Sequence, residues 1–442
     1  MTSAAASVVV DAAPWWRAPE NARFLIEGGA PLVGEIAIGG AKNAALPLLV
    51  CALLTDDELV LRNLPRILDV AMLSTVLRDL GLAVEWEEGG SLTGRFRGLG
   101  LGAGTVNADL VARMRASFLI AGALVARLGR VSLPLPGGDA IGSRPVDFHL
   151  AGLRAMGAKV DVSGGTVTIE ADSGLHGATI VLPMPSVGAT EHLMIAAALA
   201  DGETRIVNAA HEPEIVDLAA LLNAMGARIE GAGQDTVVIQ GVPRLHGADH
   251  AVMPDRIELG TYVAAAAMTG GRLLMPGVTT AMLGAAAPVM RAAGVDLVDL
   301  DDGLLAGRSP RGLRGTDVVT QPFPGFATDL QPQMVALLGM ADGAAMVTET
   351  LFENRFQHVR ELVRMGAQMT VMGNLARIRG IRRYTAAAVE ATDIRAGSAL
   401  VLAALAGEGT TEIAGVMHLD RGYEDLERKL IRCGARIRRV AA

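Results

Sequence analysis

The chain has 442 residues, of which 51% are apolar but only 3% aromatic, so its cores must be built from Ala, Val, Leu, Ile and Met. A formal net charge of −8 argues against a nucleic-acid-binding protein, and it means that an anionic substrate must be held by a local basic cluster. The two cysteines, Cys51 and Cys433, lie among apolar residues and imply no disulfide framework, which fits a reducing, cytoplasmic compartment.

Residues 1–23 are expected to be an extension outside the folded domains. They carry no basic residue ahead of their apolar run, and Asp11 interrupts that run, so the stretch does not resemble a signal peptide. No apolar run in the chain reaches the roughly 18 residues that a membrane span needs. We therefore expect a soluble protein without a membrane partner.

One phrase then recurs along the chain: the end of an amphipathic helix, a glycine expected at the left-handed cap position, and a strand. In the first copy, Val70, Leu73, Val76, Leu77 and Leu80 fall on one helical face ahead of the glycine. Segments 166–170, 236–240 and 375–380 read as strands that follow a turn in later copies. The six repeated glycines are Gly81, Gly157, Gly226, Gly294, Gly366 and Gly434.

Each repeat reads as strand–helix–strand–helix–strand–strand in some circular order. A unit of roughly 70 residues cannot bury both faces of its helices alone, so six units most simply form two bodies of three. A solenoid is the structural alternative, but its repeats are usually about 20–50 residues long.

Ten short motifs occur in a fixed order along the same chain. They are GAKNAALP from residue 40, MRAS (114–117), PGGDAIGSRPVDFH (136–149), PSVGATEH (185–192), HEPEIVD (211–217), PDRIELGTY (254–262), FATDLQPQ (326–333), TETLFENRF (348–356), ATDIRAG (391–397) and HLDRGYE (418–424). Together they resemble the UDP-N-acetylglucosamine enolpyruvyl transferase family over residues 24–442. The sister family that makes 5-enolpyruvylshikimate 3-phosphate differs in the first motif and lacks a counterpart of PGGDAIGSRPVD.

The resemblance implies an α/β fold of two domains, each an inside-out α/β barrel, built from six βαβαββ repeats. One domain would comprise residues 24–44 and 254–442. The other would comprise residues 45–253 and carry an active-site loop at 134–145, with the active site between the domains. The implied reaction transfers the enolpyruvyl group of phosphoenolpyruvate to the 3-hydroxyl of UDP-N-acetylglucosamine by addition–elimination, releasing phosphate for peptidoglycan precursor synthesis.

Phosphoenolpyruvate carries a phosphate and a carboxylate, which call for cations of fixed geometry. The resemblance places Lys42, Arg144 and Arg421 at the phosphate and Arg355 and Arg395 at the carboxylate. It makes Asp329 the base for the sugar hydroxyl, and Asp393 a residue that orients the arginines. No cofactor is implied, and the histidines are not at metal-ligand spacing.

The nucleotide side of the implied site draws on two further motifs. Residues Arg144, Pro145, Val146, Asp147 and Phe148 match the segment that holds uracil, and Ser186, Val187 and Gly188 match donors to the diphosphate at a helix N-terminus. Asn43, Arg115 and Leu351 are further substrate-binding candidates. Met184 stands where some relatives have lysine, and Ala327 where many have proline.

Asp139 stands where the family usually has a reactive cysteine. A carboxyl that serves as an acid at neutral pH must have its pKa raised by about 2–3 units, which closure beside a phosphate would favour. We expect Asp139 to act as a general acid, a proton shuttle or a product-release residue. Fosfomycin alkylates the loop thiolate in this family, so the aspartate predicts resistance to it.

Two other functions remain open from the sequence. The resemblance implies a uridine nucleotide as the acceptor, and a second candidate is UMP, used by similar transferases of nucleoside antibiotic pathways. The third reading is a non-catalytic nucleotide-binding relative, which would bind the nucleotide without releasing phosphate.

Overall fold

The computed structural model describes residues 13, 16, 21–101, 108–143 and 145–441, and the chain divides into two compact units. Unit 1 contains the described parts of residues 1–17, 40–138 and 144–253. Unit 2 contains those of residues 18–39, 139–143 and 254–442. The short loop 139–143 is therefore grouped with unit 2 by its contacts, although unit 1 flanks it on both sides in the sequence.

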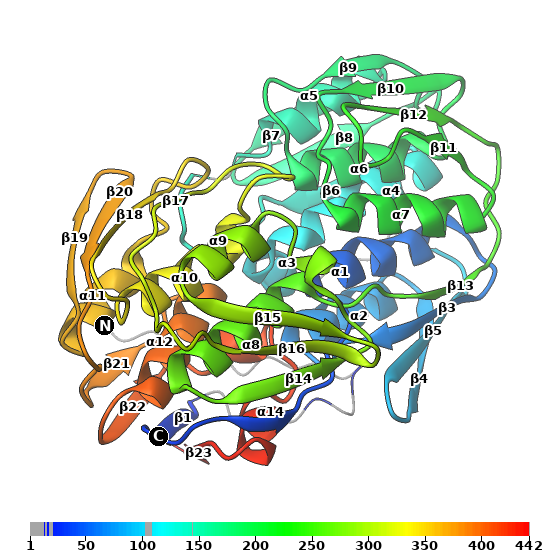
Figure 1. Cartoon of the computed structure of the whole chain (residues 1–442). Coiled ribbons are helices and arrows are strands. Elements are labelled where there is room, and N and C mark those ends of the chain that lie inside the picture. Colours follow the sequence, from blue (N-terminus) through cyan, green and yellow to red (C-terminus); the bar gives the residue numbers. More distant parts are fainter. Residues whose placement is uncertain (1–12, 14–15, 17–20, 102–107, 144, 442) are drawn as a thin grey trace. The chain divides into compact units, whose positions relative to one another are not determined.

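The described residues form six sheets, three in each unit (Figure 1). Five of them share one pattern: a parallel pair of strands continues into two antiparallel strands, as in β9∥β10 followed by β12 and β11. Within the described residues, the sheet β6-β8-β7 has only the antiparallel part. This shared topology confirms the six-repeat α/β fold class predicted from the sequence.

The strands of unit 1, in sheet order, are β13 (Asp249–Ala251), β3 (Leu59–Leu64), β5 (Leu92–Gly98) and β4 (Leu82–Glu88); β6 (Arg130–Pro134), β8 (Thr166–Glu170) and β7 (Lys159–Ser163); and β11 (Arg228–Glu230), β12 (Thr236–Gln240), β10 (Glu203–Val207) and β9 (Thr179–Val181). Its helices are α1 (Lys42–Val50), α2 (Leu68–Asp79), α3 (Ala108–Arg113), α4 (Leu119–Leu128), α5 (Asp147–Ala155), α6 (Val187–Ala197) and α7 (Pro213–Ala224), with short 3₁₀ turns η1 (Cys51–Leu54) and η2 (Arg115–Phe118).

The strands of unit 2, in sheet order, are β21 (Ala388–Glu390), β22 (Thr410–Ala414), β1 (Arg23–Glu27) and β23 (Arg436–Val440); β15 (Val295–Leu300), β16 (Gly303–Arg308), β14 (Arg272–Pro276) and β2 (Val33–Glu35); and β17 (Val318–Val319), β18 (Ala344–Thr348), β20 (Leu375–Arg379) and β19 (Gln368–Met372). Its helices are α8 (Arg256–Thr269), α9 (Ala286–Ala292), α10 (Gln331–Leu338), α11 (Gln357–Arg364), α12 (Ile394–Ala406), α13 (Met417–Asp420) and α14 (Leu426–Arg432), with the 3₁₀ turns η3 (Thr280–Leu283) and η4 (Thr328–Leu330).

The repeated glycines end a helix in every repeat, as predicted. All six have a positive φ between 90° and 101°, a conformation that costs other residues steric strain, and a strand follows each of them. The strands predicted at 166–170 and 236–240 are β8 and β12, and the strand predicted at 375–380 is β20.

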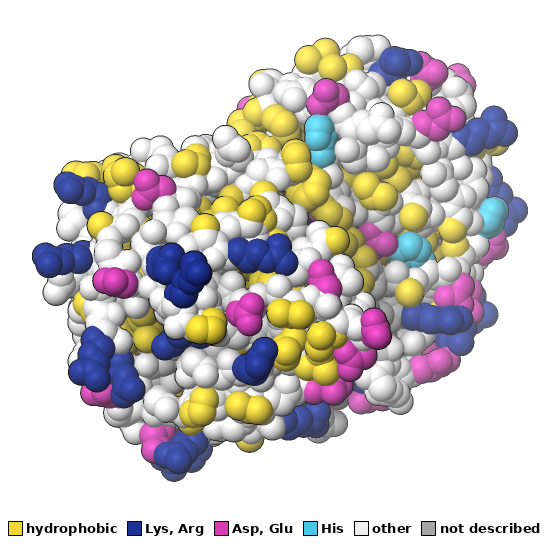
Figure 2. Space-filling model, viewed as in Figure 1, with side chains coloured by type: hydrophobic (Ala, Val, Ile, Leu, Met, Phe, Trp, Pro, Cys, Tyr) yellow, Lys and Arg dark blue, Asp and Glu magenta, His cyan; other side chains and the backbone are white. Residues whose placement is uncertain are grey.

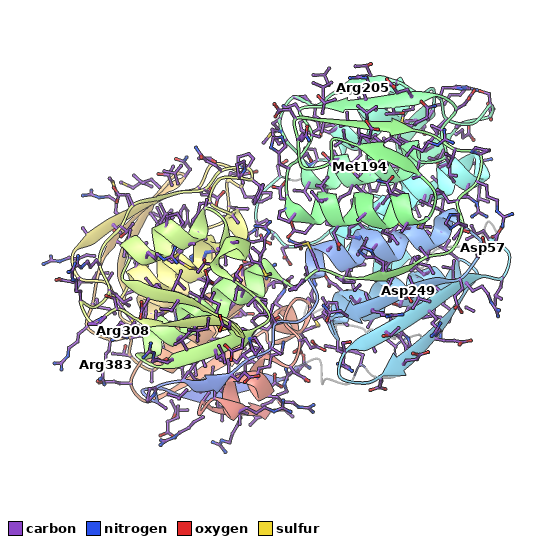
Figure 3. The ribbon with its side chains drawn as sticks, turned by 45° about the vertical axis from the view of Figure 1, so that its right-hand side comes forward. Asp57, Met194, Arg205, Asp249, Arg308 and Arg383 are labelled. Atoms are coloured by element: carbon purple, nitrogen blue, oxygen red, sulfur yellow. The ribbon has the colours of Figure 1, made fainter. Side chains whose placement is uncertain are left out.

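The most deeply buried helices occupy the inside of each unit and the sheets the outside. In unit 2, α12 packs against both α8 and α10, and nearly every residue of these three helices is buried. A helix that is apolar all round suits such a position. In unit 1, Met194 of α6 lies in the interior whereas Arg205 of β10 lies on the outer surface (Figure 3).

Basic and acidic side chains are interspersed over the face shown in Figure 2, and no large area of that face carries charge of only one sign.

Candidate active site

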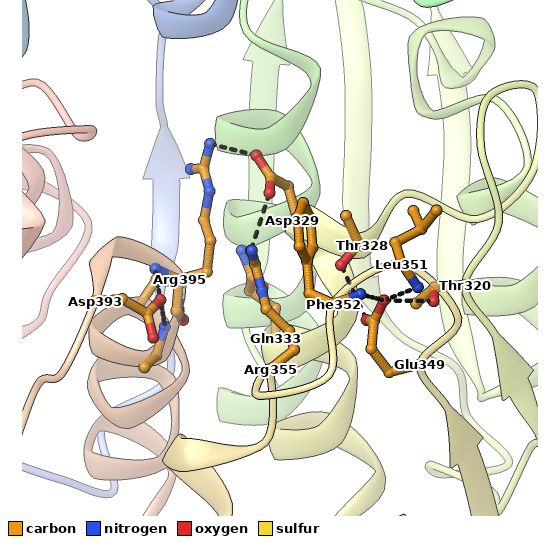
Figure 4. Close-up of polar contacts among 12 residues, drawn as sticks. Thr320, Thr328, Asp329, Gln333, Glu349, Leu351, Phe352, Arg355, Asp393 and Arg395 are labelled. Atoms are coloured by element: carbon orange, nitrogen blue, oxygen red, sulfur yellow. Dashed lines mark hydrogen bonds and ion pairs between the residues drawn. The ribbon is translucent and has the colours of Figure 1, made fainter. Parts of the chain in front are cut away.

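Asp329 lies between two buried arginines in unit 2 (Figure 4). Its Oδ1 accepts a hydrogen bond from Nη2 of Arg355 at 2.9 Å, and its Oδ2 accepts one from Nη2 of Arg395 at 3.0 Å. The arginine side chains are only 3% and 4% exposed, whereas Asp329 is 26% exposed. Two cations on one carboxylate leave this cluster with excess positive charge.

The two arginines also retain unused hydrogen-bond donors. Nε of Arg355 and Nη1 of Arg395 are buried and have no hydrogen-bond partner among the described residues. Buried guanidinium donors are rarely left unsatisfied. The cluster is therefore suited to accept a further anion with planar geometry, such as a carboxylate.

Local structure fixes the position of Arg395. Asp393 caps α12, and its Oδ1 accepts hydrogen bonds from the backbone N–H groups of Arg395 and Ala396, both at 2.9 Å. The guanidinium carbon of Arg395 lies 5.5 Å from the ring centroid of Tyr423. Burial lowers the pKa of Arg395, but the Asp329 carboxylate and Tyr423 raise it above its usual value, so the side chain stays charged.

Glu349 ties the loop of Asp329 to the segment of Arg355. This buried carboxylate accepts hydrogen bonds from the hydroxyls of Thr320 and Thr328, both at 2.9 Å, and from the backbone N–H groups of Leu351 and Phe352. The sequence analysis missed Glu349, although it lies inside the motif TETLFENRF. A carboxylate in that turn, preceding two residues whose N–H groups it accepts, was the available signal.

Asp139 and Arg421 form a second charged pair in unit 2. Nη1 of Arg421 donates to Oδ1 of Asp139 at 2.6 Å, and the two side chains are 11% and 16% exposed. Burial lowers the pKa of His418, and the charge of Arg421 lowers it further, although Asp139 and Asp393 oppose this shift. His418 is thus a neutral, half-buried neighbour of these groups.

Lys42 begins α1 in unit 1 and forms an ion pair with Asp69 of α2. Its Nζ lies 3.0 Å from Oδ2 of Asp69, whose side chain is 1% exposed. Asn43, the next residue of α1, is half-buried. A buried carboxylate orients the lysine, which leaves a fixed positive charge at this helix N-terminus. The sequence offered no motif for Asp69.

The nucleotide candidates of unit 1 gather at the start of two helices. Nη2 of Arg115 donates to the carbonyl oxygen of Pro145 at 2.6 Å. Ser186 caps α6 by accepting from Ala189 N–H at 3.4 Å. A methyl group added to Gly188 would lie 3.5 Å from the ring of His149, so the starts of α5 and α6 lie close together.

The remaining nucleotide candidates fill the same region. Val146 is buried, Phe148 and Val187 are half-buried, and Asp147 is exposed in the first turn of α5. His149 and His192 contact each other through their Nδ1 atoms at 2.9 Å, and burial lowers the pKa of both rings, that of His192 to about 3. Arg144 lies outside the described residues. Met184 is 43% exposed and carries no charge that could hold a diphosphate.

Among the described residues, no three His, Cys, Asp or Glu side chains are grouped as metal ligands. Cys51 and Cys433 are buried and not disulfide-bonded, and burial raises the pKa of both thiols. Over the same residues, every helix is too short or too polar to cross a membrane.

Known proteins resemble the chain over nearly its full length. The sequence profile of the family described as EPSP synthase (3-phosphoshikimate 1-carboxyvinyltransferase) matches residues 26–430. A UDP-N-acetylglucosamine 1-carboxyvinyltransferase of Granulibacter bethesdensis is 53% identical over 95% of this chain and 99% of its own. One of Gluconacetobacter diazotrophicus is 52% identical over the same shares.

Two solved structures share the fold. The enolpyruvyl transferase NikO from Streptomyces tendae is 27% identical, superimposes with a TM-score of 0.86, and is matched over 96% of this chain and 100% of its own. EPSP synthase from Acinetobacter baumannii, at 20% identity and a TM-score of 0.71 over 95% and 100% of the two chains, supports the fold alone. The chain therefore belongs to the enolpyruvyl transferase family, whose members are transferases.

Proposed function

We propose that the chain transfers the enolpyruvyl group of phosphoenolpyruvate to the 3-hydroxyl of UDP-N-acetylglucosamine, with release of phosphate. The observation that carries this proposal is the pair of buried arginines on Asp329 with donors still unused, which suits the carboxylate of phosphoenolpyruvate. The identity of 53% to a transferase with this acceptor in its name supports the choice of substrate.

Unit 2 would bind phosphoenolpyruvate. Arg355 and Arg395 would hold its carboxylate, and Arg421 its phosphate, with Asp393 fixing the backbone that carries Arg395. In the structure these guanidinium groups contact Asp329 and Asp139. Binding would therefore exchange an internal carboxylate for a substrate anion at each arginine.

This exchange supports roles for both aspartates in proton transfer. Once the carboxylate of phosphoenolpyruvate binds the arginines, Asp329 is free to accept the proton of the acceptor hydroxyl, whose oxygen forms a bond to C2. Asp139, displaced from Arg421 beside an anionic phosphate, would gain a proton and give it to C3. Loss of a C3 proton and departure of phosphate then restore the double bond.

Unit 1 would bind the uridine nucleotide. Pro145, Val146, Asp147 and Phe148 would hold the uracil, together with Arg144, and the half-buried residues Ser186, Val187 and Gly188 at the start of α6 would face the diphosphate. Asn43 and Arg115 would add charge and hydrogen bonds to the nucleotide. Lys42 would hold the phosphate of phosphoenolpyruvate, and Leu351 is a further substrate-binding candidate. The net charge of −8 supports small anionic substrates bound at local clusters rather than nucleic acid.

The chain would act in the cytoplasm, where both substrates are made, in the synthesis of peptidoglycan precursors. Phosphate release from phosphoenolpyruvate, measured with UDP-N-acetylglucosamine and in parallel with UMP, tests the proposal. Product in the first reaction supports it, and product only with UMP would assign the other acceptor. Nucleotide binding with no phosphate released in either reaction would show a non-catalytic relative.

A further inference from the structure

The loop that carries Asp139 is docked onto a short segment ahead of helix α11. Asn354 donates its backbone N–H to the carbonyl of Ile141 at 3.0 Å and its Nδ2 to the carbonyl of Ala140 at 2.9 Å. Nε2 of Gln357 donates to that same Ala140 carbonyl. Oε1 of Glu353 accepts the backbone N–H of Ser143.

These contacts fix the path of the loop rather than its side chains. Every hydrogen bond above uses a backbone group of residues 140–143, so the docking is independent of whether the loop carries aspartate or cysteine at position 139. Gly142 allows the close approach, because a methyl group added there would lie 2.5 Å from Oε2 of Glu353. Ile141 is buried, which anchors the loop by apolar contact as well.

The docking segment has two faces with different contacts. Glu353 and Asn354 are exposed and hold the loop, whereas Arg355, directly after them, is 3% exposed and bonds to Asp329. Glu349 fixes the turn that leads into this segment through the N–H groups of Leu351 and Phe352. The path of the loop and the position of the carboxylate-binding arginine are thus set by the same few residues.

We infer that Glu353, Asn354 and Gln357 are positioning residues of the reaction, which hold the loop so that Asp139 lies opposite Arg421. This inference rests on the proposed enolpyruvyl transfer. It adds that the binding of an anion at Arg355 and the ordering of loop 139–143 depend on each other. Residues 353–357 contain Arg355 and also the side chains that contact the loop.

The double variant Glu353→Ala/Gln357→Ala tests the inference, since Glu353 is exposed and Gln357 only half-buried, so both side chains can be removed with little effect on the fold. Hydrogen–deuterium exchange of the peptide covering residues 139–143 should become faster, and kcat should fall roughly tenfold, as for loss of two hydrogen bonds. The KM for the uridine nucleotide, which unit 1 binds, should change less than about twofold. Glu353→Gln keeps an acceptor oxygen and should restore both exchange and kcat in the Glu353 single variant.

The matched control is Glu408→Ala, which removes an exposed glutamate of unit 2 that pairs with Arg383 and should alter neither readout. Unchanged exchange in the double variant would overturn the inference, and so would a lower kcat that Glu353→Ala and Glu353→Gln share. The exchange measurement needs no turnover. If the unmodified chain released no phosphate, the proposed function would fail while the docking of the loop would still be decided.

Discussion

Replacing Asp139 with asparagine is expected to strengthen the binding of phosphate groups while slowing turnover. The carboxylate of Asp139 contacts Nη1 of Arg421 at 2.6 Å, so an incoming phosphate must displace it. Asparagine is similar in size but carries no charge, and it competes for the guanidinium far less. The affinity for phosphate groups should therefore rise while kcat falls, although the two usually fall together in an active-site variant.

The size of the effect follows from the pair itself. A hydrogen bond between charged groups contributes about 1.5–3 kcal/mol. The side chains are 11% and 16% exposed and so keep some contact with water, and we take the lower end of this range. About 1.4 kcal/mol corresponds to tenfold tighter binding. Loss of a general acid should lower kcat by roughly 10²–10⁴.

Calorimetric titration with phosphoenolpyruvate and with inorganic phosphate measures the first effect, and steady-state phosphate release measures the second. Asp301→Asn, which changes an exposed aspartate in the turn between β15 and β16, is the control for the loss of one negative charge. Binding no tighter than in the unmodified chain would refute the exchange of partners at Arg421. An unchanged kcat would refute the acid role of Asp139.

Three further predictions concern other residues or reagents. Asp329→Asn should lower kcat roughly 10²–10⁴-fold with the nucleotide affinity kept within about twofold, and a kcat within tenfold of the original would rule out Asp329 as the base. Fosfomycin should not inactivate the unmodified chain with time, whereas Asp139→Cys should be inactivated, because a thiolate attacks the epoxide far better than a carboxylate; time-dependent loss of activity in the unmodified chain would contradict this. Burial lowers the pKa of His358 to about 3, so the folded chain should lose stability as the pH falls below about 6.5, by about 2 kcal/mol at pH 5. In urea unfolding at pH 7 and pH 5, His358→Leu should lose about 2 kcal/mol less of its free energy of unfolding between the two pH values than the unmodified chain. An equal loss in both proteins would disprove the assignment.

The repeats of the fold could be predicted because their signals are local. About ten residues of sequence are enough to recognise a glycine that ends a helix, or a strand of alternating polarity after a turn, as at Gly226 and β12. The number of strands in each sheet could not be predicted in this way, because it depends on pairing between distant parts of the chain. Strand β9 joins its sheet by parallel pairing with β10, across the whole of helix α6, and no pattern in three residues predicts that contact.

The candidate site also has a part that could be predicted from the sequence and a part that could not. The motifs supplied the charged residues, since chemistry on two anions needs them, but not the side chains that those residues contact. Asp139 and Arg421 are 282 positions apart, so their contact depends on the tertiary fold. Asp69 was missed because a buried carboxylate that orients a neighbour has no sequence signal of its own. Glu349 lies inside a motif, but its partners Thr320 and Thr328 are 29 and 21 positions away and could not be predicted.

Strand β1 has a consequence for how the chain is made. It lies in the middle of its sheet, antiparallel to β22 on one side and to β23 on the other, with Phe24 and Ile26 buried. The ribosome therefore releases the central strand of this sheet first and its neighbours last. Residues 40–253 emerge in between and contain all the strands of unit 1. Unit 1 can fold during translation, while β1 stays unpaired until β22 has been made and completes its sheet only when Arg436–Val440 follows.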